Sequence, residues 1–520
     1  MDKKHELLLS VVHISAYEAT FEIINDNPYY ASFKYDVYVN RKLVLENQSK
    51  NVFSIFGLKP DTKYHITVCA GNLKGSSDVK TTLPSKVYSV SDLDIDSTGK
   101  TVVTSKIQEL IDNAINNSII YFPKGIYLIT PLFVKSNLTI YLEKDAILLG
   151  DIDRNNYPII PGIILENGKN RVGGSWEGAS DDNYASLITG IGVDNFSLIG
   201  EGVIDGNAQN GDWWVNHKVK RGAWRPHDIF FNRSRNIDVV GLNIKNSASW
   251  TIHPYYSDYL RFINLNIEAI RPSPNTDGID PESCHDVLIL GVDFNTGDDC
   301  IAIKSGKMEM VKDHYKPSSD IVIRNCHMGD GHGGVVFGSE ASSGIYNVKV
   351  DKCYFDGTDR GFRIKTRRGR GNKAKIEDVC FNNIIMNNVK NALVINMFYY
   401  CDADGKSDYV QAKYALPIDE RTPSIGKFVF ENMKFLNTRI CAGYFYGLPE
   451  AKIEEIDLRN IEVTYTSEDV DKEEPAMMLD CEAIAKGGFF FRNVSRVEID
   501  NVNIRGQIGK EYNYEGDKYE

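Results

Sequence analysis

The stretch Asn236-Ile237-Asp238-Val239-Val240-Gly241 decides the fold, because related stretches recur along the chain. Each has a polar residue, then alternating apolar residues, then Gly or Asn. Others start at Asn195, Tyr259, Asp286 and Asp320, so that successive starts from Asn236 lie 23, 27 and 34 residues apart. Residues 347–350, 427–430 and 496–499 continue the series towards the C-terminus.

Short strands at a variable spacing of 23–34 residues are typical of a solenoid whose coils carry loops of unequal length. We therefore expect an all-β protein built on a right-handed parallel β-helix. The lack of long helical patterns after residue 116 argues against an α/β barrel. An array of β-sandwiches is the weaker alternative, because it would not produce one repeat over roughly 300 residues.

The N-terminal residues have a different pattern. Residues 19–23 and 35–39 alternate apolar and polar side chains, as half-buried strands do. The stretch Leu58-Lys59-Pro60-Asp61-Thr62-Lys63-Tyr64 resembles the corner of fibronectin type III sandwiches, where a tyrosine hydroxyl bonds to upstream backbone. We predict a fibronectin type III-like sandwich over residues 1–84, a polar linker over 85–100 and a β-helix domain over 101–520.

A helix is predicted at the start of the second domain. Over residues 104–116, one face at 3.6-residue periodicity carries Ile107, Leu110, Ile111, Ala114 and Ile115. A stack of coils must cover its terminal apolar face and its unpaired edge, so we expect this helix to cap the first coil.

Four segments rich in Gly, Asn, Asp and aromatic residues interrupt the repeat: 151–188, 206–228, 306–319 and 400–425. In a solenoid, such insertions gather on one face and build the walls of a site. Trp213, Trp214 and Trp224 lie in one of them, and they suit sugar stacking and the anchoring of a loop equally well.

Four short motifs carry the chemistry: Asn275-Thr276-Asp277, Gly297-Asp298-Asp299, Gly331-His332-Gly333 and Arg363-Ile364-Lys365. Hydrolysis of a glycosidic bond needs an acid for the leaving oxygen and a base or nucleophile at the anomeric carbon, and three aspartates can supply both. Asp277 and Asp298 are 21 residues apart, close to one coil, which predicts adjacent rungs of one face. Crowding raises the pKa of one carboxylate, which keeps an acid protonated near neutral pH.

Basic residues follow the acidic motifs. Arg363 and Lys365 alternate about Ile364, so in a strand both cations would share one face and suit a sugar carboxylate. Seven of the fourteen residues from 360 to 373 are basic, Arg367 among them. Such a run is more often a solvated face or a nucleic-acid patch, but beside an acidic cluster a polyanionic sugar is the better interpretation. His332 is expected to hydrogen-bond a carboxylate and tune its proton; a structural role is the alternative.

The bulk composition limits the classes of function. The net charge of −12 argues against a general nucleic-acid binder, and no apolar run reaches the length of a membrane span. The nine cysteines are scattered without the spacing of a metal site, which predicts free thiols in a reducing compartment and neither metal nor cofactor. The start of the chain lacks a typical signal peptide, which predicts a cytoplasmic location; a leader removed beforehand would mean secretion or the periplasm.

In its four motifs the sequence resembles the polygalacturonase family, glycoside hydrolase family 28, over roughly residues 90–515. The resemblance implies a right-handed parallel β-helix and hydrolysis by single displacement with inversion. It implies that Asp298 is the general acid, that Asp277 and Asp299 activate water and that His332 supports the acid. The substrate-binding residues expected on this basis are Asn275, Arg363, Lys365, Tyr399, Arg367 and His253. For His253 and its neighbour Trp250, a core position is as well supported as a place in the cleft.

The extended basic motif and the N-terminal sandwich are similar to the exo-acting bacterial branch of that family. We therefore expect an exo-polygalacturonase that removes galacturonic acid from the non-reducing end of pectic oligosaccharides, with no nucleic-acid or membrane partner. Rhamnogalacturonan or xylogalacturonan hydrolases and a pectate lyase are the alternative enzymes. A solenoid that only binds carbohydrate is the alternative without activity. Inversion predicts carboxyl groups about 6.5–9.5 Å apart, with room for a water between them.

Overall fold

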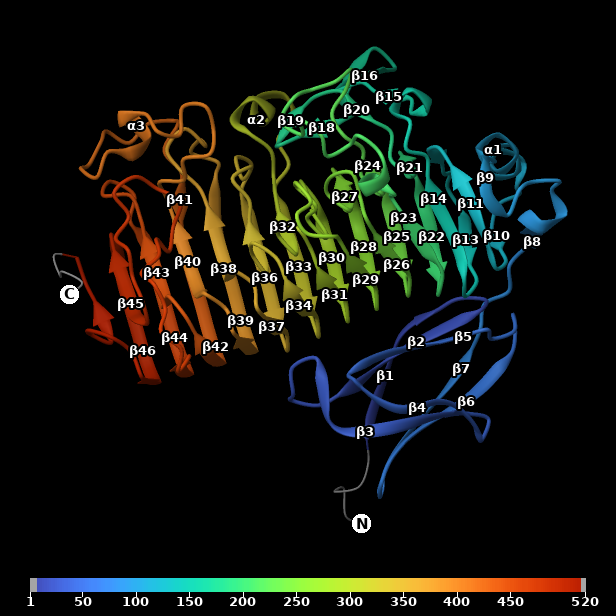
Figure 1. Ribbon diagram of the computed structural model, residues 1–520, viewed down its shortest axis with the longest axis horizontal. Helices are drawn as coiled ribbons and strands as arrows, with labels where there is room; N and C mark the ends of the chain where they lie inside the picture. Colours follow the sequence, from blue (N-terminus) through green and yellow to red (C-terminus); the bar gives the residue numbers. More distant parts are fainter. Residues whose placement is uncertain (1–6, 516–520) are drawn as a thin grey trace.

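The computed structural model describes residues 7–515 and shows a long solenoid of parallel strands with a small antiparallel sandwich against its side (Figure 1). The all-β class and the right-handed parallel β-helix are confirmed. The first six residues, which entered the prediction of location, lie outside the described residues, and the location stays a prediction.

The coils of the solenoid have three faces, and on each face a strand pairs in parallel with the equivalent strand of the next coil. The first face contains β10 (Ser118–Phe122), β13 (Leu138–Leu142), β22 (Asp194–Gly200), β25 (Arg235–Val240), β28 (Asp258–Ile263), β30 (His285–Leu290), β33 (Ser318–Arg324) and β36 (Ile345–Asp351). The second contains β11 (Gly125–Ile129), β14 (Ala146–Gly150), β23 (Val203–Asp205), β26 (Asn243–Lys245), β29 (Asn266–Glu268), β31 (Asp293–Asn295), β34 (His327–Asp330) and β37 (Tyr354–Asp356).

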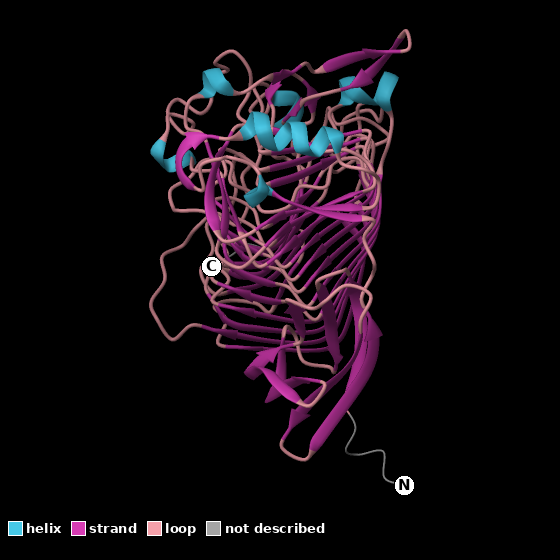
Figure 2. Cartoon of the chain, turned by 90° about the vertical axis from the view of Figure 1, so that its right-hand side faces the viewer, coloured by secondary structure: helices cyan, strands magenta, loops and turns pink. Residues whose placement is uncertain are grey.

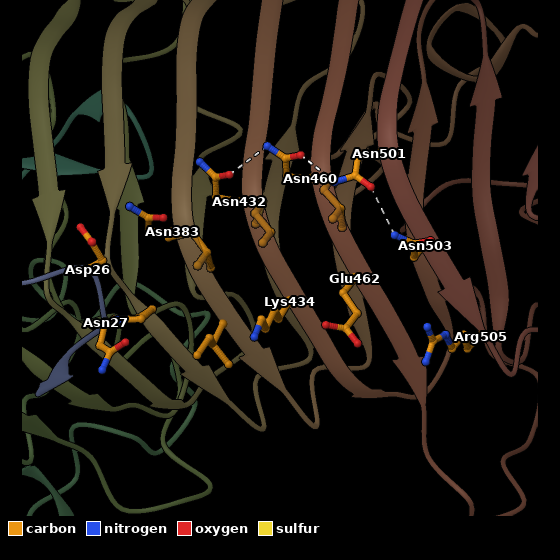
Figure 3. Close-up of a pocket in the computed structure, with 15 residues that line it drawn as sticks. Asp26, Asn27, Asn383, Asn432, Lys434, Asn460, Glu462, Asn501, Asn503 and Arg505 are labelled. Atoms are coloured by element: carbon orange, nitrogen blue, oxygen red, sulfur yellow. Dashed lines mark hydrogen bonds between the residues drawn. The ribbon is translucent and has the colours of Figure 1, made fainter. Parts of the chain in front are cut away.

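In the last coils these two faces are spanned by single bent strands, namely β39 (Lys375–Asn387), β42 (Lys427–Thr438), β44 (Ile453–Tyr465) and β46 (Val494–Arg505). The short β41 (Ser424–Ile425) pairs with the start of β39. At the bends, Asn501 donates a side-chain hydrogen bond to Asn460 at 2.9 Å, and Asn460 donates one to Asn432 at 3.1 Å (Figure 3). This ladder of amides crosses the rungs and forms part of the wall of an outer groove.

The third face is formed by two groups of strands. The first group is β12 (Leu132–Phe133), β21 (Ile188–Ile191), β24 (Ile229–Asn232) and β27 (Ile252–Tyr255). The second group is β32 (Ile301–Ile303), β35 (Val335–Phe337), β38 (Arg360–Lys365), β40 (Asn391–Asn396), β43 (Cys441–Tyr446), β45 (Gly487–Arg492) and β47 (Tyr512–Asn513). Ile279 bridges β27 on one side and β32 on the other, so the rung that contains it joins the groups into one face.

The repeated sequence pattern has a backbone explanation. The polar residue that begins each repeat has a left-handed backbone, with φ of 53° at Asn236, 54° at Asp286 and 56° at Asp320. The residue that ends it does too, with φ of 82° at Gly241 and 51° at Asn325. Asn, Asp and Gly tolerate this conformation better than other residues, and the apolar side chains between these points face the core.

Helix α1 (Thr104–Asn113) caps the first coil as expected, with Ile107 and Ile111 fully buried. It ends three residues earlier than predicted because Ala114 has an extended backbone, and Ile115 is therefore exposed. Residues 85–100 also differ from the prediction of a linker. Within them lie β8 (Lys86–Ser89), the 3-10 helix η2 (Val90–Asp92) and the start of β9 (Thr98–Val102), and both strands extend the parallel stack.

The N-terminal sandwich has two antiparallel sheets. One has the order β1 (Leu8–Ile14), β2 (Glu18–Ile24), β5 (Val52–Phe56), and the other β4 (Lys42–Lys50), β3 (Tyr30–Val39), β6 (Lys63–Ala70), β7 (Leu73–Lys80). At the predicted corner the amide of Lys59 donates to the Tyr64 hydroxyl at 2.8 Å. The sandwich is confirmed; its assignment to the fibronectin type III family stays a prediction.

The sandwich lies against the first and second faces of the solenoid, on the side away from the insertions (Figures 1 and 2). Glu22 accepts two hydrogen bonds from the guanidinium of Arg324, at 2.9 and 2.7 Å. Tyr29 donates to Asp293 at 3.0 Å. A separate apolar cluster at this seam contains Ala16 of the sandwich with Val240 and Ile263 of the solenoid. The sandwich is thus held to the solenoid by partly buried hydrogen bonds and by a buried apolar cluster.

Two further findings concern the bulk predictions. Among the described residues, no helix has the length and apolar character needed to cross a membrane. All nine cysteines lie within the described residues and have free thiols, and Cys401 is the exposed one.

Candidate active site

Three carboxylates meet on the third face. Asp277 precedes the joining rung, while Asp298 and Asp299 lie in the bend before β32. The rungs are neighbours, because the amide of Gly278 donates to the carbonyl of Asp299 at 2.9 Å. One oxygen of each carboxylate lies within 4.8 Å of an oxygen of the other two. The oxygens are thus closer together than the carboxyl separation of about 6.5–9.5 Å that inversion led us to expect.

The two neighbouring aspartates have different partners. Asp299 is fully buried and forms an ion pair with Lys365 at 2.6 Å. Asp298 is partly exposed, and its carboxylate lies 3.3 Å from Nδ1 of His332. The bend before β32 allows both carboxylates to reach the same cluster, which two successive residues of a straight strand cannot do.

The hydrogen bond between His332 and Asp298 shifts the pKa of both groups. The hydrogen bond with Asp298 raises the pKa of His332 above its usual value. Burial acts to raise the pKa of Asp298, but the bond from His332 and the charge of Lys365 outweigh it, so that pKa is lowered. Glycine follows His332 for a steric reason: a Cβ at Gly333 would lie 3.0 Å from Oδ1 of Asp299.

Lys304, which the motif analysis missed, balances the charge on the other side of the cluster. Its ammonium lies 2.9 Å from Asp280 and 3.7 Å from Asp277, and all three side chains are buried. Burial, followed by the charge of Asp280, raises the pKa of Asp277 well above its usual range. Burial also raises the pKa of Asp280 to about 7, against the opposing effect of Lys304. The alternation Ile301-Ala302-Ile303-Lys304 resembles Arg363-Ile364-Lys365 and was the signal that could have identified this residue.

The predicted cations and their neighbours also reach the cavity. Arg363 and Lys365 both lie on β38, and their charged groups are 5.8 and 6.0 Å from the ring centre of Tyr399. Asn275 lies at the rim, where its side-chain oxygen accepts a hydrogen bond from Arg225 at 2.7 Å. The structure thus gathers eight of the ten predicted residues around one cavity.

The other two predicted residues lie elsewhere. His253 is fully buried beneath the face, 3.0 Å from Glu282 and 3.2 Å from a ring nitrogen of His227, and does not line the cavity. Arg367 is buried and is already bound by Asp404 at 2.6 Å, with Asp402 at 3.2 Å. Both side chains have their hydrogen-bonding capacity used by the protein, so neither fits the predicted contact with substrate.

The tryptophans divide between the core and the site. Trp213 is fully buried against Tyr157 and Tyr184, which anchors its loop. Trp224 stacks on Trp176, and Trp176 stacks on Trp250 with ring centres 5.6 Å apart. Of these rings only Trp250 lines the cavity, where the ammonium of Lys304 lies 4.3 Å from its ring centre.

The insertions lie above the strands in Figure 1, and three of the four line the cavity, through Glu177, Lys218 and the pair Cys401 and Asp402. They contain η3 (Arg154–Asn156), η4 (Ala208–Asn210), β15 (Ile159–Ile160), β16 (Ile163–Glu166), β17 (Lys169–Val172), β18 (Ser175–Trp176), β19 (Ala179–Ser180), β20 (Asn183–Tyr184), α2 (Met308–His314) and α3 (Asp408–Gln411). Lys307 links three of them: its amide donates to Gly178 at 2.7 Å, and its ammonium lies 3.3 Å from Asp402.

The resulting cavity has a volume of about 460 Å³. Besides the residues already described, it is lined by Glu177, Lys218, Ser339, Glu340, Asp359, Arg360, Cys401 and Met477. A concave, polar site of this size can hold a short chain of sugars whose carboxylates meet the cations on its floor.

Comparisons with known proteins find one family profile over the middle of the chain. The profile described as Glycosyl hydrolases family 28 matches residues 164–413, and one described as Rhamnogalacturonase A/epimerase, pectate lyase-like, matches residues 87–162. A probable polygalacturonase of Vitis vinifera is 34% identical over 292 residues, 56% of this chain and 57% of that protein. An endo-polygalacturonase of Pectobacterium parmentieri is 28% identical over 316 residues, 57% of this chain and 72% of that protein. The chain spans about half the length of the plant relatives that it matches.

Solved structures agree with the fold. The chain is similar to the family 28 exopolygalacturonase of Yersinia enterocolitica, with a TM-score of 0.69, 19% identity and 99% of both chains covered. It is also similar to a hyperthermoactive exopolygalacturonase from Thermotoga maritima, with a TM-score of 0.65, 24% identity, and 82% of this chain and 94% of that one covered. At these identities the likeness concerns the fold alone. Residues 164–413 of this chain thus match the profile of glycoside hydrolase family 28, and the sequence relatives that the chain is similar to are polygalacturonases.

Proposed function

We propose that the protein is an exo-acting polygalacturonase, which hydrolyses α-1,4-galacturonosyl bonds from the non-reducing end of pectic oligosaccharides with inversion. The main support is the cluster itself, in which three aspartates share one cavity with Lys304, Lys365 and Arg363. A neutral sugar would not need three cations in one cavity, whereas each galacturonic acid unit carries a carboxylate that these cations can bind.

In this proposal Asp298 and His332 hold the proton that the leaving oxygen needs. The pair shares one proton, which rests on His332 in the free site because the pKa of His332 is raised and that of Asp298 is lowered. When a glycosidic oxygen approaches Asp298, this carboxyl group delivers a proton to the oxygen and His332 replenishes it.

Asp277 and Asp299 position the attacking water. Each has a buried Oδ1 without a hydrogen-bond partner among the described residues. One water about 2.8 Å from each of two oxygens can bridge them when they are at most 4.8 Å apart. This arrangement provides a place for the water although the carboxylates are close together.

The exo mode is supported by the insertions. Three of them are joined through Lys307, with Gly178 on one side and Asp402 on the other, into a continuous wall beside the cluster. A polymer that extended across this wall would collide with it, whereas a chain end can stop there.

The test is a time course of products from defined oligogalacturonates. Release of one small product from the earliest times supports the proposal, and an early ladder of intermediate sizes would contradict the exo mode. NMR of the first product should show the β anomer, because inversion at an α linkage gives β; an initial α anomer would indicate retention.

The same assay separates the alternatives. A pectate lyase would leave one fragment of each cleavage with a 4,5-unsaturated unit at its new non-reducing end, which absorbs in the ultraviolet, whereas hydrolysis leaves both fragments saturated. A rhamnogalacturonan or xylogalacturonan hydrolase would prefer those polymers to galacturonan of equal length. A protein that only binds carbohydrate would release no reducing sugar from any of them.

A further inference from the structure

Glu340 is a buried carboxylate in the cavity wall to which the proposed reaction gives no role. It lies in the turn that follows β35 and is 8% exposed, and it lines the same cavity as the three aspartates. Its side-chain position is fixed by Ser339, whose hydroxyl donates to Oε1 at 2.9 Å. A Cβ at Gly338 would lie 2.8 Å from Oε2, so the glycine leaves room for the carboxylate.

The charges around Glu340 keep it ionised. Burial acts to raise its pKa, but Lys304, Lys307 and Lys365 favour the charged form and hold that pKa below its usual value. An ionised carboxylate accepts hydrogen bonds and cannot donate them. It therefore cannot bind the carboxylate of a sugar, and the groups that it can bind are donors such as sugar hydroxyls.

One oxygen of Glu340 is available to such a donor. Oε1 has the bond from Ser339, whereas the structure gives Oε2 no hydrogen-bond donor among the described residues. An ionised acceptor that lines the cavity favours a ligand that supplies a donor, because a ligand without one displaces water and leaves this oxygen without a hydrogen bond.

Glu340 also packs against the linked wall. A Cβ placed on Gly178 would lie 2.5 Å from Cγ of Glu340, so the backbone of the 151–188 insertion packs directly on its side-chain stem. Gly178 is in turn bound to Lys307, which belongs to the linked wall. A sugar that contacts Glu340 therefore lies next to this wall.

We propose that Glu340 recognises the free non-reducing end of the substrate by accepting a hydrogen bond from the terminal 4-hydroxyl group. Within an α-1,4-linked chain this oxygen is part of a glycosidic bond and has no hydrogen to donate. Glu340 is thus a specificity-determining residue that selects chain ends over interior units. This inference rests on the proposed function and assigns a basis for its exo mode.

The test uses two trimers that differ at this oxygen. One is saturated trigalacturonate; the other has a 4,5-unsaturated unit at its non-reducing end and lacks the 4-hydroxyl. We expect the wild-type protein to have a kcat/KM about 10- to 100-fold higher for the saturated trimer, because a site built around a hydroxyl rejects an analogue that lacks it. In Glu340→Gln the preference should fall to a few-fold, and in Glu340→Ala it should disappear.

Glu309→Gln is the matched control, since Glu309 is an exposed carboxylate on α2 in the neighbouring insertion. It should keep the wild-type preference. Thermal unfolding of each variant distinguishes loss of recognition from loss of fold, and the Gln variant keeps the test informative if Ala does not fold. A preference unchanged in Glu340→Gln and Glu340→Ala, or absent in the wild type while it hydrolyses the saturated trimer, overturns the inference. If the wild type hydrolyses neither trimer, the proposed function itself fails.

Discussion

At the scale of single residues, the main result is where the proton is held. Crowding among the aspartates was expected to raise one pKa; in the structure burial is the larger cause, and it raises the pKa of both Asp277 and Asp280, with the charge of Asp280 adding to the effect on Asp277. The proposed acid, Asp298, has a lowered pKa and draws its proton from His332. Acid and base are thus separated by different partners within one cluster, as in other sites where two carboxylates have opposite roles.

The first prediction concerns Asp298. Replacing it by Asn removes the group that protonates the leaving oxygen while keeping the size of the side chain. General acid catalysis contributes about 10²- to 10⁴-fold, so kcat should fall by that factor. The Tm should stay close to that of the wild type, because the carboxylate is partly exposed. Near-wild-type turnover of Asp298→Asn would exclude it as the acid.

The second prediction concerns pH. The pair needs its proton, so activity should be present below the raised pKa of His332 and should be lost as pH rises through it. His332→Gln removes the side chain that holds the shared proton. The alkaline limb of the pH profile of kcat/KM should therefore move to lower pH. The acidic limb should remain, because it reports ionisation of the base, Asp277, whose raised pKa places the loss of activity above the usual range of an aspartate. An unchanged alkaline limb would mean that His332 does not supply the proton of the acid.

Much of the site could be predicted from residue types at fixed spacing. Asp277, Asp298 and Lys365 lie in short motifs that can be recognised from the sequence alone. Lys304 ends an alternation like that of Lys365 but lies outside the four motifs, and Glu340 lies in a turn without any motif, so contacts across rungs were needed to place both at the cavity. Arg367 was misplaced for the same reason, since its partner Asp404 lies in a distant insertion.

At the scale of secondary structure elements, the repeat was predictable because each turn has a chemical requirement. Left-handed positions select Asn, Asp or Gly, and buried strands select apolar residues, so both leave a trace in the sequence. Strands without these traces were missed. Residues 85–100 read as a polar connection because β9 is mostly exposed at the first edge of the stack.

The third prediction concerns the buried ion pair between Asp280 on the joining rung and Lys304, which follows β32. Lys304→Met would leave Asp280 buried without its cation, and removal of one partner of a buried ion pair costs about 3–5 kcal/mol. The variant should therefore unfold at a clearly lower urea concentration than the wild type. Lys304→Met combined with Asp280→Asn should recover part of the loss. If the single variant is as stable as the wild type, the ion pair does not contribute to the stability of the fold.

At the scale of the whole molecule, the sandwich and the solenoid are held together by a close seam. Phe56 lies against Gly241 and Val52 against Gly291, where a Cβ would collide with each side chain. A sequence pattern within either part cannot show such a contact, because the partners are far apart along the chain. This is why the sandwich could be predicted while its docking could not.

The fourth prediction tests this seam. Gly241→Ala adds a methyl group at a left-handed position and presses it on Phe56. Gly192→Ala is the control, because Gly192 has a similar φ of +67° and nothing within 4 Å of its Cβ position. The control should lose only the backbone contribution of about 1 kcal/mol. Gly241→Ala should lose more and should become easier to cleave by protease at the seam. If both variants lose the same free energy of unfolding, the contact between Gly241 and Phe56 adapts to the added methyl group without cost.

The position of the sandwich has a practical consequence. Because it is docked on the side of the solenoid opposite the insertions, its outer sheet and the insertions face away from each other (Figure 2). A protein immobilised on a resin through the sandwich would keep the insertions, and the cavity beside them, turned to the liquid. Coupling through the insertions would instead turn the cavity towards the support and hinder the entry of a large ligand.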